Sequence, residues 1–176
     1  LGLSQGDAAL DAYRGDGEFA GVGPDPRLRA IGSLYPEVVH VIARADSGIE
    51  SLAEMRGRRV AIGPAASAAR RTAMNVLAAH GLAAHDIELR DLALGAALVA
   101  LRAREIDGIV TVIGIPADSI RVALSVVPLR LLALEASAVE SLAAGNPAYD
   151  PFILPAGTYT EGAPEISTIA TPAILL

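Results

Sequence analysis

This sequence of 176 residues has no cysteine, no tryptophan and no lysine, and only 3% of its residues are aromatic. The absence of cysteine excludes disulfides, thiolate catalysis and cysteine metal ligands. No apolar run reaches the roughly 18 residues of a membrane-spanning helix. The 14 basic residues, all arginine, are outnumbered by 20 acidic residues, which gives a net charge of −6. That balance argues against a nucleic-acid surface, which needs a basic stripe.

Motifs for catalysis and for metal or cofactor binding are also missing. The three histidines, His40, His80 and His85, are not spaced as metal ligands with any aspartate or glutamate. The sequence contains no nucleophile elbow, zinc-protease, phosphate-loop or dinucleotide-binding pattern. We therefore expect no enzymatic activity, no metal and no cofactor.

The residues that are present indicate an α/β domain with a large aliphatic core, because 52% of them are hydrophobic. Apolar strand-like segments alternate with helical ones, which predicts a parallel-rich sheet flanked by helices, with ligands beyond the carboxyl ends of the strands. Strands are expected over 38–43, 59–62, 87–92, 108–113 and 129–134, and helices over 8–13, 47–55, 67–80, 94–104, 116–124 and 139–144. The segment 166–176 stops in mid-strand with an apolar edge unpaired, so self-association through open strand edges is also expected.

The run 57–73 is the most informative stretch. It predicts a buried strand, a turn at Gly63-Pro64 and a helix that opens at Ser67. Free N–H groups and the positive end of the helix dipole make such a turn a ready anion site. The alternative is an ordinary strand-to-helix connection capped by Ser67. Arg70 or Arg71 is suited to bind a ligand carboxylate, or else lies on a solvated helix face.

Two further positions, Tyr35 and Asp7, each allow two interpretations. Tyr35, in Tyr35-Pro36-Glu37, is either a ligand contact or an amphipathic side chain at a strand entry. Asp7 lies where a strand ends and a helix begins, so it either binds a ligand amino group or caps its own helix. Ser67 has no base nearby in the sequence, which makes a nucleophilic role improbable.

These positions fall into one pattern, because the chain resembles the TAXI family of solute-binding proteins of TRAP transporters. Leu34-Tyr35-Pro36-Glu37 is similar to the family's crossing strand, and Ser4-Gln5-Gly6-Asp7 is similar to its Gln-Ser-Asp segment. The match also includes Gly57–Pro64 with Ser67, then Ile106-Asp107-Gly108, Gly114-Ile115-Pro116-Ala117 and 153–159. One departure is that Ala66-Ser67-Ala68-Ala69 stands where the family has Gly-Ser-Gly-Thr. Family segments at both ends are also missing, so the chain resembles the middle of a member.

The resemblance implies a two-lobed type II periplasmic-binding-protein fold that closes on a ligand. The second lobe would span 41–134, and an incomplete first lobe with the crossing strands would comprise 1–40 and 135–176. The implied function is extracytoplasmic or periplasmic binding of a small carboxylate, glutamate-like or dicarboxylic, for delivery to membrane permease subunits. The residues expected to bind the ligand are Ser67, Ala68, Ala69, Tyr35, Gln5, Asp7 and Gly114.

Three alternatives remain open at this point. The first is a type II binding protein of an ABC importer or a ligand-sensing domain. The second is an enzyme on a doubly wound α/β sheet, which the missing motifs disfavour. The third is a fragment without independent function, whose open strand edges pair with a second copy.

Overall fold

The computed structural model describes residues 1–176 and contains one sheet of eight strands in the order β1-β8-β2-β5-β3-β4, with β6 beside β2 and β7 beside β8. The strands are β1 (Leu3–Gln5), β2 (Gly32–Arg44), β3 (Arg59–Ala61), β4 (Glu88–Arg90), β5 (Gly108–Gly114), β6 (Leu129–Leu132), β7 (Asp150–Leu154) and β8 (Ile166–Leu175). The α-helices are α1 (Gly6–Arg14), α2 (Ala68–Ala79), α3 (Leu94–Arg102), α4 (Asp118–Val126) and α5 (Ala136–Gly145). Short 3₁₀ turns lie at Gly17–Phe19, Leu52–Met55 and Ala84–Asp86. None of the helices is both long and apolar enough to cross a bilayer.

Strand β2 organises the sheet. Its 13 residues pair with β5 on one edge and, on the other edge, first with β8 and then with β6. Residues 38–43 of β2 are buried on both faces, as expected of a central strand rich in valine and isoleucine. The α/β class is therefore confirmed.

The expectation of a parallel-rich sheet is wrong in detail. Only β3 pairs in parallel, with β4 and β5, whereas β1, β2, β6, β7 and β8 all form antiparallel pairs. The physical reason is that β2 leads into the segment that carries β3 to β6 and β8 follows that segment. The two long strands therefore run antiparallel to each other, and β2 also runs antiparallel to β5 and β6. Continuous apolar runs are typical of burial on both faces and carry no information about strand direction.

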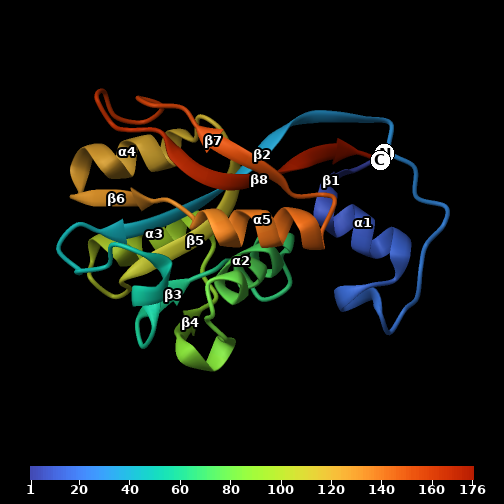
Figure 1. Cartoon of the computed structure of the whole chain (residues 1–176), viewed down its shortest axis with the longest axis horizontal. Helices are drawn as coiled ribbons and strands as arrows, with labels where there is room; N and C mark the ends of the chain where they lie inside the picture. The colour runs from blue at the N-terminus through green and yellow to red at the C-terminus, as the bar shows by residue number, and fades with distance from the viewer.

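Helices cover both faces of the sheet (Figure 1). On one face α2 and α5 pack on Val39, Val41 and Ala43 of β2, and on the other face α3 and α4 pack around Ile42. This alternation along β2 follows from the two-residue period of a strand. Helix α1 lies at the end of the molecule near β1, where Gly2 and Leu176 exchange both backbone hydrogen bonds and bring the two termini together.

The C-terminal strand differs from the expectation. Strand β8 is not an open edge, because β1 and β7 pair with it on one side and β2 pairs with it on the other. The apolar run 166–176 therefore lies inside the sheet, and the argument for self-association through this strand falls. The predicted division into a lobe at 41–134 and a partial lobe at 1–40 and 135–176 stays a prediction.

The other sequence-based elements differ in their boundaries. The expected helical segment 47–55 is a 3₁₀ turn over Leu52–Met55 that begins with a capping box of Ser51 and Glu54. The Ser47 hydroxyl, which precedes this turn, donates to the Arg44 carbonyl. Helix α2 ends at Ala79, one residue before the expected end, and the left-handed Gly81 (φ +73°) follows it.

Candidate functional site

The N-terminus of α2 follows a tight turn at the carboxyl end of β3. Gly63 has φ +95°, and its ideal Cβ would lie 3.0 Å from the Ser67 Oγ, so this turn requires glycine. Ser67 is extended and caps the helix, because its Oγ accepts from the Arg70 N–H at 3.2 Å. Its hydroxyl donates to the Pro64 carbonyl at 2.8 Å. The capping interpretation of Ser67 is thus confirmed, and its hydroxyl hydrogen is already used within the turn.

The N–H groups of Ala68 and Ala69 are the free donors of this turn. They occupy the first two positions of α2, where no intrahelical acceptor exists, and no other backbone carbonyl or side chain accepts from them. Of the arginines that follow, Arg70 pairs with Asp91, and Arg71 lies between Asp11 and Glu18. The Arg71 Nε and Nη2 are buried and have no hydrogen-bond partner.

Gly114 and Tyr35 meet at the carboxyl end of β5. A Cβ on Gly114 would lie 3.2 Å from the Tyr35 Cε2, so the missing side chain allows the ring to approach the strand. The Tyr35 side chain is about half exposed, at 48%. The two residues lie on neighbouring strands, where Glu37 pairs with Gly114. A ring placed in this way forms one wall beside the strand ends.

Gln5 and Glu37 lie next to this wall. Gln5 pairs with Ala173 of β8, and Ala173 pairs with Tyr35 of β2. Burial raises the pKa of the Glu37 carboxyl, a hydrogen bond from the Gln5 side chain opposes the rise, and the charge of Asp7 adds to it. The region therefore holds an amide and a half-buried carboxyl within reach of each other.

Asp7 is the most deeply buried of the predicted site residues, with no exposed surface. One carboxylate oxygen accepts from the Thr72 hydroxyl at 2.6 Å and from the Tyr149 hydroxyl at 2.9 Å. The other oxygen accepts from the Ala8 N–H at 2.8 Å. Its own N–H donates to the Thr171 hydroxyl at 3.3 Å. The carboxylate is thus satisfied by protein donors and ties α1 to α2 and to the segment before β7.

Sequence reasoning missed the partners of Asp7. Burial, with the nearby Asp7 charge second, raises the pKa of the Tyr149 hydroxyl far above its ordinary value, so Tyr149 stays a donor. Its hydroxyl also accepts from the Asn75 side chain at 3.0 Å. Thr72 carried a usable signal, because it shares the buried face of α2 with Val76. Tyr149, in a turn-rich stretch 142 residues from Asp7, carried none.

The structure links the predicted residues through shared neighbours. Thr72 Oγ1 lies 3.2 Å from the Ala68 carbonyl, which places Asp7 within one turn of the α2 N-terminus. Thr171 joins Asp7 to β2, since it pairs with Glu37. Gln5 and Gly114 flank the same pair of strands. None of the four main cavities is lined by a predicted ligand-binding residue.

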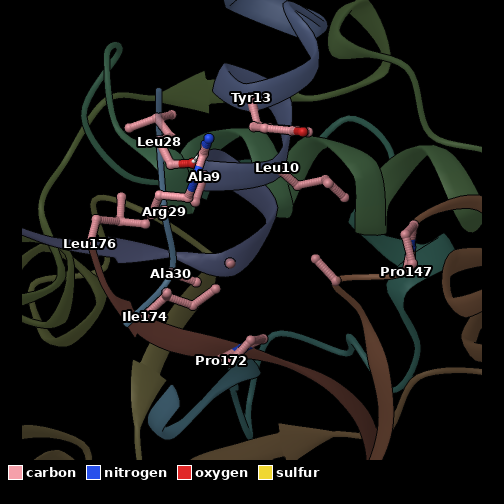
Figure 2. Close-up of a pocket in the computed structure, with 12 residues that line it drawn as sticks. Ala9, Leu10, Tyr13, Leu28, Arg29, Ala30, Pro147, Pro172, Ile174 and Leu176 are labelled. Carbon is pink, nitrogen blue, oxygen red and sulfur yellow. Dashed lines mark hydrogen bonds between the residues drawn. The ribbon is translucent and has the colours of Figure 1, made fainter. Parts of the chain in front are cut away.

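The largest cavity, of about 540 Å³, lies on another side of α1 (Figure 2). Leu10 and Tyr13 of α1 face it together with Pro172 and Ile174 of β8, and Arg29 is the one charged side chain in its lining. Gly6 allows this packing, since a Cβ there would lie 2.7 Å from the Pro172 Cγ. The Arg29 side chain donates to the carbonyls of Pro26 and Leu28. Most of the remaining lining is apolar.

No group of three or more histidine, aspartate or glutamate side chains is arranged to hold a metal ion. His40 is buried at 2% exposure, and its Nδ1 and Nε2 lie 2.9 Å from the Val38 carbonyl and 2.8 Å from the Tyr159 hydroxyl. The Tyr159 hydroxyl also accepts from the Ala117 N–H at 3.3 Å. Burial lowers the pKa of His40 to about 4, so it is neutral near pH 7. This histidine therefore anchors the 155–165 loop.

The fold is similar to that of known periplasmic binding proteins. The aliphatic sulphonate binding protein SsuA from Escherichia coli matches with a TM-score of 0.53 and 20% identity, over 74% of this chain and 42% of that chain. The alkanesulfonate-binding protein SsuA from Xanthomonas axonopodis pv. citri matches with a TM-score of 0.46 and 24% identity, over 59% of this chain and 37% of that one. The chain thus spans less than half the length of these two structures. In addition, residues 1–176 match the model of a protein family described as NMT1-like.

Proposed function

Since this chain belongs to the NMT1-like family, we propose that it is part of an extracytoplasmic solute-binding protein that serves a membrane transporter. The similarity in fold to a periplasmic binding protein supports the proposal. Binding and release break no covalent bond, so such a function needs none of the catalytic groups that the sequence lacks.

The proposed ligand is a small anion, and one observation carries this choice. The free N–H groups of Ala68 and Ala69 lie at the positive end of α2, a helix of 12 residues, at the carboxyl end of a parallel strand. Helix dipole and N–H donors together favour a carboxylate or a sulfonate at this place. Tyr35, Gln5 and Gly114 would form the facing wall. Asp7 would position α1 rather than touch the ligand, because its oxygens already accept from Thr72, Tyr149 and Ala8.

The chemical class of the ligand and the type of transporter are also proposals. The TAXI resemblance favours a glutamate-like or dicarboxylic ligand and TRAP-type permease subunits as partners. The same N–H donors suit a sulfonate, and an importer of the ABC class would then be the partner. Both versions imply a ligand enclosed between 41–134 and a lobe to which 1–40 and 135–176 contribute, with closure between them.

Replacing Ala68 with proline tests the anion site with little damage to the helix. Proline at the first helical position is well tolerated, and it removes the Ala68 N–H alone. Ser67 before it is extended (φ −100°, ψ 145°), as a residue before proline must be. The matched control is Ala136→Pro, at the first position of α5 after the extended Glu135 (φ −65°, ψ 141°).

Calorimetry with glutamate, succinate, methanesulfonate and ethanesulfonate would then compare the variants. We expect Ala68→Pro to weaken the binding of the preferred anion about ten-fold or more, because a charge-assisted hydrogen bond is lost. Ala136→Pro should bind like the parent. Equal affinity in all three proteins for every anion bound would contradict the proposed site, and binding of none of the four anions by the parent protein would contradict the proposed ligand class.

A further inference from the structure

A pocket lined by three arginines lies at the opposite end of the sheet from the α2 N-terminus. It has a volume of about 470 Å³ and is lined by Arg44, Asp46, Arg102, Arg104, Val126 and neighbouring backbone. Arg44 ends β2, Arg102 ends α3, and Arg104 follows α3 shortly before β5 begins. Since Gly114 is at the far end of β5, the length of that strand, roughly 20 Å, separates the pocket from the proposed anion site.

Arg44 forms the floor of this pocket, with only 11% of its side chain exposed. Its Nε donates to Asp46 at 2.9 Å and its Nη1 donates to the Ile106 carbonyl at 2.9 Å. No protein acceptor is bonded to its Nη2. Asp46 is bound on its other oxygen by Arg104 at 2.7 Å. These hydrogen bonds, that from Arg44 foremost, lower the pKa of Asp46. Asp46 therefore fixes two guanidinium groups in place. Asp107, which accepts two hydrogen bonds from the Arg59 side chain, also lies 3.6 Å from the Arg44 Nη1.

Arg102 is exposed and forms no ion pair or hydrogen bond. The lining thus holds three positive charges and one negative charge. The C-terminal ends of α3 and α4 also reach the pocket, and each contributes about half a negative charge. The two helix ends together lower the net positive charge of the pocket to roughly one, and they do not cancel it. Unused N–H donors on Arg44 and Arg102 remain for a ligand.

The backbone of Arg104 is strained. It is the one non-glycine residue of the chain with a positive φ, +63°. Its N–H donates to the Leu101 carbonyl and the Glu105 N–H donates to the Ala100 carbonyl, which makes Arg104 the left-handed residue of a Schellman motif. Nine glycines fill the other positive-φ positions. Strained positions of this kind cluster at active sites, ligand clamps and switch regions.

We propose that this pocket binds a phosphate-bearing anion. Guanidinium groups match phosphate oxygens through paired hydrogen bonds, and the volume exceeds what a single small oxyanion fills. Three exposed valines adjoin the pocket: Val126 lines it, Val122 precedes it by one turn of α4, and Val99 precedes Arg102 by one turn of α3. The phosphate therefore belongs either to a free small molecule or to a lipid headgroup whose chains meet these valines.

Calorimetry with sodium pyrophosphate at low ionic strength tests the site. We expect Arg102→Gln to weaken binding about ten-fold and Arg102→Gln/Arg104→Gly to weaken it further, because each loses charge-assisted donors. Arg104→Gly alone should weaken binding while its melting temperature stays equal to or above that of the parent. Arg121→Gln, which removes a charge of α4 that is paired with Asp118 outside the pocket, is the matched control and should bind like the parent.

The Ala68→Pro protein separates this site from the proposed solute site. Pyrophosphate binding should survive in Ala68→Pro and be lost in Arg102→Gln/Arg104→Gly. Three results would overturn the proposal. They are the reverse pattern, an equal loss of pyrophosphate binding in Arg121→Gln, and a parent protein that binds neither pyrophosphate nor phosphatidylglycerol vesicles.

Sedimentation with phosphatidylglycerol vesicles, compared with phosphatidylcholine vesicles, identifies the source of the phosphate. If the protein co-sediments with phosphatidylglycerol vesicles and Arg102→Gln/Arg104→Gly abolishes this, the ligand is a lipid phosphate. If the protein binds pyrophosphate but does not co-sediment with the vesicles, the ligand is a free phosphate compound.

Discussion

At the scale of single residues, the buried carboxylate of Asp7 depends on hydrogen bonds from three protein donors. Asp7→Asn would turn one acceptor oxygen into an amide donor that faces the Thr72 hydroxyl, the Tyr149 hydroxyl or the Ala8 N–H, each of which donates to Asp7. We expect a loss of about 1–3 kcal/mol in the free energy of unfolding, since a buried polar group is left unsatisfied. Urea denaturation measures it.

The control for this prediction lies at the rim of the same cluster. Asn75 is exposed and bonds to the Tyr149 hydroxyl from outside, so Asn75→Ala should cost only about 0.5–1.5 kcal/mol. Equal effects of the two substitutions would show that the Asp7 carboxylate is not the centre of the cluster.

The buried imidazole of His40 predicts a dependence of stability on pH. Its pKa falls from 6.5 in the unfolded chain to about 4 in the folded protein, because burial disfavours the charged form. The unfolded chain binds the proton first, so this contribution is complete above pH 6.5 and is lost as the pH falls toward 4. The linkage amounts to roughly 3 kcal/mol over that range.

Unfolding free energies measured between pH 7.5 and 4 check this expectation. The slope should be smaller in His40→Gln than in the parent, whatever its absolute stability. His85→Gln is the control, since the His85 side chain is 86% exposed, and it should keep the parental slope. Parallel curves for His40→Gln and the parent would contradict the prediction.

At the scale of secondary-structure elements, the docking of α1 on β8 depends on a missing side chain. An alanine at Gly6 would place Cβ 2.7 Å from the Pro172 Cγ and 2.9 Å from its Cδ, atoms held in a rigid ring. We expect Gly6→Ala to destabilise the protein by about 1–3 kcal/mol, because α1 must move away from the strand. Thermal or urea unfolding measures the change.

Gly95 offers a matched comparison in α3. Nothing lies within 4 Å of its ideal Cβ and its φ is negative, so Gly95→Ala should be neutral or stabilise by up to about 1 kcal/mol. If both substitutions changed stability alike, helix propensity rather than contact with Pro172 would explain them.

The elements also show how far sequence reasoning reaches. The strand around 59–62, the Ser67 cap and helix α2 were predictable, because capping and periodicity are local properties. Strand direction and the place of β8 were not, since both depend on pairing between distant segments, such as β2 with β5 and Thr168 with the Val39 carbonyl. The contact of Tyr149 with Asp7 was beyond reach for the same reason.

At the scale of the whole molecule, the sheet predicts an order of local stability. Strand β2 pairs on both edges and is buried at 38–43, whereas the turns at 21–31 and 155–165 have few hydrogen bonds. Hydrogen exchange should therefore be slowest at 38–43 and 109–112, and fastest in those turns. Exchange in β2 as fast as in α1 would contradict the central role of β2.

The position of β8 also has a consequence for the order in which this domain folds. Strand β8 lies between β1 and β2, which both precede it by more than 100 residues. Strand β1 therefore has no strand partner until residues 166–175 are synthesised, whereas β2 can pair earlier with β5 and β6. Contacts this distant in sequence make folding slow, so the docking of β1 and α1 should be the late step of folding.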